Sequence, residues 1–146
     1  MSTTAVFAYG TLEIPAVMEA VTGRRFPRAA GTLRGFARFR VEGEVYPGLV
    51  RAPRARTAGV VYTSVDARSL ERLDDFEGDL YERRPVQVRL SAGGHASAYA
   101  YVVRASGRAR ISTEPWDRAR FVADELQEYL TECRAFRARR LARTGR

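Results

Sequence analysis

The first residues of the chain combine a short apolar run with a stretch of helical spacing. Apolar residues 5–9 end at Gly10, a pattern that indicates a buried strand opening into a turn. Apolar positions three and four apart recur over residues 14–22, where Pro15 suits the first helical turn and Gly23 a helix end. The chain is therefore predicted to begin with a strand, a glycine turn and a short helix.

The middle of the chain carries strand patterns. Residues 28–41 include two glycines and alternate apolar with polar side chains, which predicts bent strands of a curved sheet. Residues 57–63 are rich in β-branched and aromatic side chains and predict a central strand. Between these segments, residues 46–48 indicate a turn, and residues 51–56, with three arginines and Pro53, indicate an exposed loop.

A second helix is predicted after the central strand. Asp66 is a favourable N-cap for a helix over residues 67–76, and Gly78 suits the end of that helix. Glu77 is therefore expected at or just past a helix C-terminus.

The last part of the chain predicts a hairpin and a long helix. Residues 85–90 and 96–103 alternate as two strands joined through residues 91–95. From near Pro115, apolar residues recur at helical steps, and this helix is expected to pack on the sheet. The recurring residues are Trp116, Ala119, Val122, Leu126, Tyr129, Cys133 and Phe136.

This order of elements predicts the α+β class, with a mixed, mostly antiparallel, barrel-like sheet flanked by helices. A length of 146 residues and an apolar content of 45% suit one domain over residues 1–146. Its core is expected over about residues 5–105, and the C-terminal helix and basic tail over about residues 114–146.

Arginine alone supplies the positive charge. The net charge is +8, lysine is absent, and the chain from Cys133 onward carries six arginines and no acidic residue. They are Arg134, Arg137, Arg139, Arg140, Arg143 and Arg146. The favoured interpretation is a frayed, solvated helix end whose cations suit the negative pole of the helix dipole; the alternative is contact with an acidic partner. No nucleic-acid motif is recognisable, so nucleic-acid binding is not expected.

Composition and motifs limit the expected location of the protein and the kinds of site it can form. The N-terminal segment has no basic region, and its apolar run is too short for a signal peptide or a membrane span, so a cytoplasmic protein is expected. The single cysteine, Cys133, cannot alone form a disulfide or a thiolate metal site, and is expected to lie partly buried on a helix.

The single histidine, His95, lies in the predicted hairpin turn, which disfavours a catalytic triad. Neither a metal nor a cofactor is expected, because no ligand cluster or phosphate-binding glycine motif is present.

Glu77 is the candidate for acid/base chemistry. The helix dipole and the neighbouring Asp74 and Asp75 disfavour a further anion there, so its pKa should rise if the side chain is buried. Such a carboxylate exchanges protons with amines near neutral pH; the alternative is an ordinary solvated glutamate.

The turn formed by Tyr9, Gly10, Thr11 and Leu12 is the candidate binding loop. Glycine permits a close approach, and several backbone N–H groups there can point toward one place. Such a turn binds a carboxylate or an oxyanion; the alternative is a tight connection between strand and helix without a ligand.

Several segments, taken together, resemble the γ-glutamylcyclotransferase-like family. They are residues 6–12 (VFAYGTL), 20–26 (AVTGRRF), 46–49 (YPGL), 59–62 (GVVY), 73–78 (LDDFEG) and 81–83 (YER). The segments occur in the family's order, and the likeness covers about residues 5–103. The chain is most similar to the branch of plant avirulence-induced proteins and their bacterial relatives.

The resemblance implies a function and roles for particular residues. Glu77 matches the family's catalytic glutamate, and residues 9–12 match the loop whose backbone binds the γ-glutamyl group. The implied reaction cyclises the γ-glutamyl group of a small γ-glutamyl amine, amino acid or peptide to 5-oxoproline, without a cofactor. Tyr81 then walls the pocket and Arg83 orients a carboxylate; the alternative for both is sheet packing and surface pairing. The alternative function is a non-catalytic protein that binds a small molecule or a partner.

Overall fold

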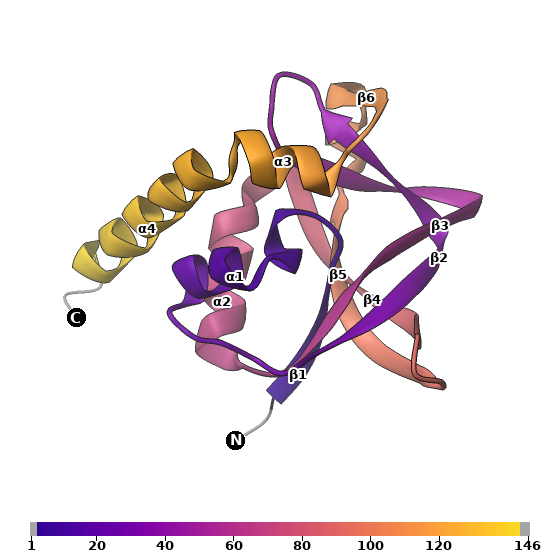
Figure 1. Cartoon of the computed structure of the whole chain (residues 1–146), viewed down its shortest axis with the longest axis horizontal. Coiled ribbons are helices and arrows are strands. Elements are labelled where there is room, and N and C mark those ends of the chain that lie inside the picture. Colours follow the sequence, from indigo (N-terminus) through magenta and orange to yellow (C-terminus); the bar gives the residue numbers. More distant parts are fainter. Residues whose placement is uncertain (1–2, 144–146) are drawn as a thin grey trace.

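The computed structural model describes residues 3–143, which form one sheet with helices gathered on one side of it (Figure 1). The strands are β1 (Thr3–Ala8), β2 (Arg28–Val41), β3 (Pro47–Asp66), β4 (Tyr81–Leu90), β5 (His95–Val103) and β6 (Ile111–Pro115). The α-helices are α1 (Pro15–Thr22), α2 (Ala67–Glu77), α3 (Arg118–Asp124) and α4 (Leu126–Arg143). Short 3-10 helices are η1 (Thr11–Glu13), η2 (Gly78–Leu80) and η3 (Ala105–Arg110). Within residues 3–143, no helix is both long enough and apolar enough to cross a membrane.

The strands close into a barrel. Their order is β3-β1-β5-β4-β2-β6, and a further pairing between β2 and β3 joins the sheet to itself. Among the described strands, β1 and β5 pair in parallel and the other pairs are antiparallel. The predicted α+β class, with a mixed, mostly antiparallel, barrel-like sheet, is confirmed.

The long strands β2 and β3 bend where their ladder is interrupted. Residues 52–55 of β3 lack a ladder partner opposite Gly35 of β2, whose φ of 86° permits the bend. Pro53 lies in this unpaired stretch, where its missing N–H costs no ladder bond. The prediction of a loop over residues 51–56 is therefore wrong in conformation, although the three arginines are exposed as expected.

Two predicted turns lie one or more residues from their expected positions. The turn expected over residues 46–48 occupies residues 42–46, because Pro47 is already the ladder partner of Arg40. In the hairpin of β4 and β5, His95 is the first residue of β5 rather than a turn residue, since it pairs with Arg89.

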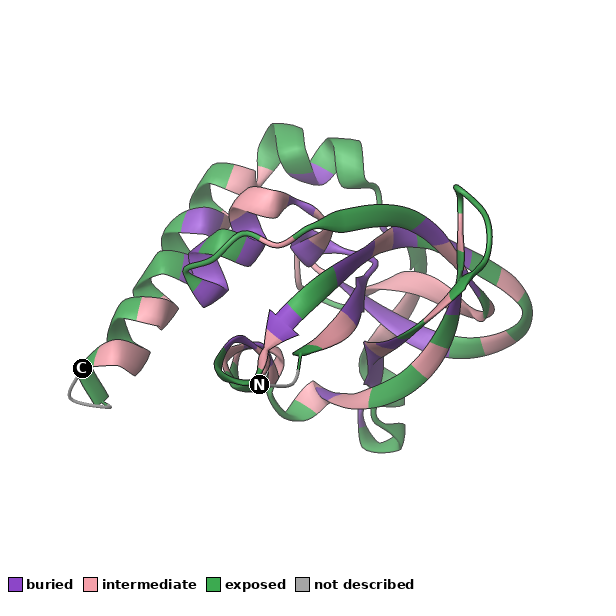
Figure 2. Ribbon diagram, turned by 90° about the horizontal axis from the view of Figure 1, so that it is seen from below, coloured by how far each residue is buried: buried purple, intermediate pink, exposed green. Residues whose placement is uncertain are grey.

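Alternate residues of β1 belong to two different apolar clusters. Val6 and Ala8 pack with residues of α1, α2 and α4. Phe7 and Tyr9 pack with a second cluster, whose other members lie on the strands. Figure 2 shows buried positions along the strands and on the inner sides of the helices. β1 therefore lies between the barrel and the helical layer, and residues 9–12, which follow it, lie where these two parts meet.

The helix α2 follows its sequence signals. The side chain of Asp66 accepts hydrogen bonds from the backbone N–H of Ser69 at 3.2 Å and from its hydroxyl at 2.7 Å, as a capping residue should. The helix ends at Glu77, and Gly78 follows with a φ of 70°. The predicted position of Glu77 at a helix C-terminus is confirmed.

The predicted long C-terminal helix is two helices. The side chain of Asp117 caps α3 by accepting the N–H groups of Ala119 and Arg120 at 2.9 and 3.3 Å. Pro115 is the last residue of β6, so the helix begins later than predicted. A break at Glu125 then separates α3 from α4.

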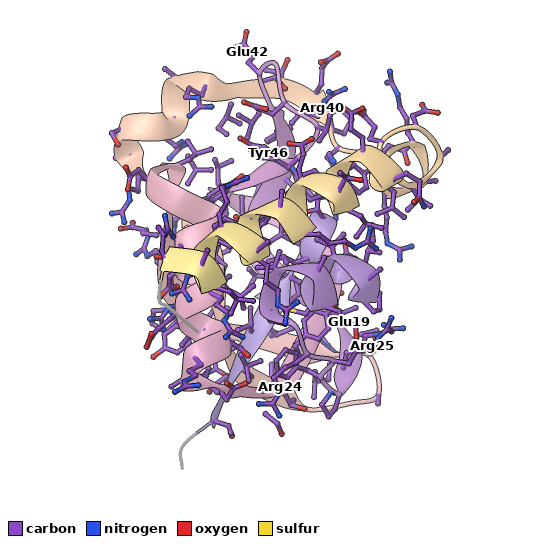
Figure 3. The ribbon with its side chains drawn as sticks, turned by 90° about the vertical axis from the view of Figure 1, so that its left-hand side faces the viewer. Glu19, Arg24, Arg25, Arg40, Glu42 and Tyr46 are labelled. Atoms are coloured by element: carbon purple, nitrogen blue, oxygen red, sulfur yellow. The ribbon has the colours of Figure 1, made fainter. Side chains whose placement is uncertain are left out.

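The helix α4 packs mainly on α1 and meets α2 through side chains, so the prediction that it packs on the sheet is wrong. The ring of Phe76 in α2 contacts the rings of Tyr129 and Phe136 at centroid distances of 6.2 and 5.4 Å. The α4 helix also crosses α1, as Figure 3 shows in a view where Tyr46 and Glu19 lie on opposite sides of it. The aromatic side chains of α4 therefore cover the end of α2.

The basic tail is more ordered than the favoured interpretation predicted. The chain remains helical to Arg143, and Arg140 forms an ion pair of 2.7 Å with Asp75 of α2. Arg137 is half-buried beside Gly23. Arg146 lies outside the described residues. The tail is therefore part of the helical layer as far as the described chain extends.

Candidate active site

A cavity of about 280 Å³ lies between η1, the end of α2 and α4. Six of the seven candidate residues line it: Tyr9, Gly10, Thr11, Leu12, Glu77 and Tyr81. These residues come from the segment that follows β1, including the start of η1, from α2 and from β4, so the barrel and the helical layer together bring them to one place.

Glu77 faces this cavity from the last turn of α2. The side chain keeps intermediate exposure through the cavity, although protein atoms surround its carboxyl group densely. Desolvation, followed by the negative charge of Asp74, raises the pKa of Glu77 from 4.5 to about 8. Within residues 3–143, its carboxyl group has no hydrogen-bond or ion-pair partner. Such a group is available to exchange a proton with a bound molecule near neutral pH.

Arg83 lies outside the cavity lining and holds Asp74. Its Nε lies 3.0 Å from Oδ1 of Asp74, and a second guanidinium nitrogen lies 3.3 Å from Oδ2. The hydroxyl of Tyr101 donates to the same Oδ1 at 2.7 Å. Asp74 lies one turn before Glu77, so Arg83 offsets part of the charge that raises the pKa of Glu77. Arg83 therefore pairs with a carboxylate of the protein, which is the alternative considered for it, and contact of Arg83 with a bound substrate stays a prediction.

Gly10 is required by a close approach at the cavity. A Cβ at this position would lie 2.6 Å from Cγ and 2.8 Å from Cδ of Pro47, distances that side chains do not tolerate. The first hydrogen bond of η1 joins the N–H of Glu13 to the carbonyl of Gly10. The N–H groups of Thr11 and Leu12 therefore have no partner within that helix.

Side chains from other elements hold this loop in place. The guanidinium of Arg38 donates to the carbonyl of Tyr9. The hydroxyl of Tyr62 donates to the carbonyl of Leu12 at 2.6 Å. Because both ends of the loop are tied by their carbonyl groups, its shape is set before any ligand binds.

Two tyrosine hydroxyls at the cavity differ in whether they can still donate a hydrogen bond to a bound molecule. Tyr81 is buried and donates to the carbonyl of Pro47 at 2.7 Å, so it serves as a wall. Tyr129 accepts a hydrogen bond from Thr11 at 3.2 Å, and its own proton meets no acceptor among the described residues. Burial raises the pKa of Tyr129, so its hydroxyl stays neutral and can donate to a bound molecule.

The wall that α4 contributes to the cavity was not predicted from the sequence. Tyr129, Glu132, Cys133, Phe136 and Arg139 line the cavity from one face of this helix. The apolar periodicity predicted that three of them share a face, but gave no sign that the end of α2 lies opposite. Cys133, expected to be partly buried, is 1% exposed.

The family model described as gamma-glutamyl cyclotransferase, AIG2-like, matches residues 6–118. This chain belongs to that family, as the sequence resemblance predicted. AIG2-like protein A of Arabidopsis thaliana is 37% identical over 83 residues, which are 57% of this chain and 50% of the relative. AIG2-like protein D of the same plant is 37% identical over 86 residues, 59% of this chain and 57% of the relative. The chain spans about half the length of the curated relatives it matches.

Solved structures share the fold. Two solution structures of Arabidopsis thaliana proteins match with TM-scores of 0.71 and 0.70. The first is 26% identical and covers 90% of this chain and 89% of its own; the second is 25% identical and covers 99% and 86%. A structure named gamma-glutamyl cyclotransferase has a TM-score of 0.65 at 17% identity, and the match covers 92% of this chain and 88% of that one. At that identity, the likeness establishes the shared fold.

Proposed function

We propose that this protein is a γ-glutamyl cyclotransferase that converts the γ-glutamyl group of a small amine, amino acid or peptide conjugate to 5-oxoproline. One observation carries the proposal: an unpartnered carboxyl group, Glu77, with a pKa of about 8, faces a cavity beside the loop of residues 9–12. Family membership and the fold shared with a structure named gamma-glutamyl cyclotransferase support it.

Glu77 moves the proton in the proposed reaction. Its carboxylate takes a proton from the α-ammonium of the substrate, and the freed nitrogen attacks the γ-carbonyl carbon to form the C–N bond of a five-membered ring. The protonated Glu77 then gives that proton to the departing nitrogen as the original amide C–N bond breaks. The ring nitrogen loses its second proton to the released amine, so the products are 5-oxoproline and the ammonium form of the amine, and Glu77 is again a carboxylate. A pKa near that of an α-amino group keeps the cost of each proton transfer small.

The rest of the cavity orients the substrate. The N–H groups of Thr11 and Leu12 offer donors for the glutamyl part, and the hydroxyl of Tyr129 offers a donor that the protein leaves unused. Because the attacking nitrogen and the carbonyl belong to one molecule, holding that molecule folded supplies much of the rate. A cavity of about 280 Å³ suits a small molecule.

The test is the release of 5-oxoproline from a panel of γ-glutamyl amines, amino acids and peptides by the wild type and by Glu77→Gln. We expect release by the wild type and a loss of about 100-fold or more in the variant, the range for a general acid/base. Glu71→Gln is the matched control, since Glu71 is an exposed glutamate on the same helix. If the folded wild type releases no 5-oxoproline from any member of the panel, the protein is a binding protein rather than this enzyme.

A further inference from the structure

The charges that line the cavity are unequally distributed. Among the lining residues in the described part of the chain, Arg139 is the single cation, and Glu77 and Glu132 are the acidic groups. Glu132 and Arg139 lie seven residues apart, two turns along α4. An anionic group of a bound molecule is therefore repelled by Glu132 and attracted toward the Arg139 end of this wall.

Contacts of α4 fix where Arg139 lies. Near the start of the helix, Tyr129 meets Thr11 of the binding loop at 3.2 Å. Eleven residues later, about 16 Å along the helix axis, the ion pair of Arg140 with Asp75 holds the helix against the last turn of α2. Arg139 therefore lines the cavity at the end of α4 that is remote from the binding loop. This end lies beside the last turn of α2, which carries Glu77.

Arg139 is unpaired, whereas its neighbour Arg140 is paired with Asp75. Arg137 is packed beside Gly23, with its Nε buried and without a hydrogen-bond partner among the described residues. Arg139 is exposed and, within residues 3–143, has neither an ion pair nor a hydrogen bond. A guanidinium group presents a rigid fork of donors that matches a carboxylate, so its unpaired position on a cavity wall suits a carboxylate ligand.

We propose that Arg139 binds a carboxylate on the leaving amine, so that the substrates are γ-glutamyl amino acids or peptides in preference to γ-glutamyl amines without a carboxylate. This inference rests on the proposed cyclotransferase function. The glutamyl part binds against the loop of residues 9–12, and the scissile amide lies beside Glu77, between that loop and Arg139. The carboxylate beyond that amide therefore points toward the arginine.

A matched pair of substrates tests the inference: γ-glutamyl-alanine and γ-glutamyl-ethylamide, which differ only by the carboxylate of the leaving amine. We expect the wild type to have a kcat/KM about 10- to 100-fold higher for γ-glutamyl-alanine, the range for one charge-assisted hydrogen-bonded pair. Arg139→Gln should lose about that factor on γ-glutamyl-alanine, mainly through KM, and less than about threefold on the ethylamide. Arg134→Gln, an exposed arginine on α4 outside the cavity lining, is the control and should keep the preference.

The outcomes separate this inference from the function on which it rests. An equal loss on both substrates would mean that Arg139 binds the glutamyl part, and would overturn the inference. A wild type that turns over both substrates equally well would overturn it too, while leaving the cyclotransferase function intact. Release of 5-oxoproline from neither of these substrates nor from any other member of the panel would overturn the function and the inference together.

Discussion

Replacing Glu77 with glutamine should remove a pH-dependent loss of stability. The folded chain raises the pKa of Glu77 from 4.5 to about 8, so the folded state binds this proton more tightly than the unfolded state. The stabilisation by the bound proton is fully present below about pH 4.5 and is lost as the pH rises through 8. A shift of this size corresponds to a change on the order of 5 kcal/mol, or about 1.4 kcal/mol per pH unit. Glutamine carries no proton to lose.

The assay is the free energy of unfolding, measured by urea denaturation at half-unit steps from pH 5 to pH 9 for the wild type and Glu77→Gln. The difference between the two proteins cancels the other titrating groups. We expect this difference to grow with pH in favour of the variant and to level off above about pH 8.5. Glu71→Gln, on the exposed side of the same helix, is the control and should follow the wild type in parallel.

Parallel curves of unfolding free energy against pH for the wild type and Glu77→Gln would contradict this prediction. They would mean that Glu77 has the same proton affinity in the folded and unfolded chains. The carboxyl group would then be hydrated at the cavity rather than desolvated.

Three further predictions concern the surroundings of Glu77. Gly10→Ala places a Cβ against the ring of Pro47 and should cost about 1–3 kcal/mol of unfolding free energy in denaturant melts, with part of the loss restored by adding Pro47→Ala. Arg83→Gln removes the cation that pairs with Asp74, so the negative charge of Asp74 should raise the pKa of Glu77 further. The rise of kcat/KM with pH, expected near pH 8, should therefore shift to higher pH by up to about one unit. Tyr129→Phe should lower kcat by about 10-fold or more and change stability little, because it removes a donor that the protein does not use.

Each of these predictions has a control variant or an outcome that would contradict it. Arg89→Gln removes an exposed arginine of the same strand, β4, and should leave the pH profile in place; a shift equal to that of Arg83→Gln would assign the effect to net charge. Full stability of Gly10→Ala would show that the loop tolerates a side chain at that position. An unchanged kcat in Tyr129→Phe would remove its hydroxyl from the reaction.

Much of the fold was predictable because local signals and tertiary contacts agree. Asp66 is a capping residue by type and caps α2 in the structure. The pattern before Gly10 is that of a strand, and β1 is buried where that pattern predicts. The C-terminal region was harder to predict, since apolar periodicity does not reveal the break at Glu125 that separates α3 from α4.

Part of the candidate site could likewise be predicted from local signals, and part of it could not. Glu77 could be placed at a helix end because Asp66 and Gly78 mark the bounds of α2. The wall provided by α4 could not be placed, because it depends on long-range contacts such as the ion pair of Arg140 with Asp75, 65 residues apart in the chain. Arg139, for the same reason, could be recognised only as one arginine of a basic tail.

The most direct test of the central claim is the identity of the product that the wild type forms from a γ-glutamyl substrate. Mass spectrometry of the reaction should detect 5-oxoproline and the released amine in equal amounts, with at least about 100-fold less of both formed by Glu77→Gln. Glutamate in place of 5-oxoproline would mean that water, rather than the substrate's own amine, attacks the γ-carbonyl. That result would contradict the cyclisation proposed for this cavity.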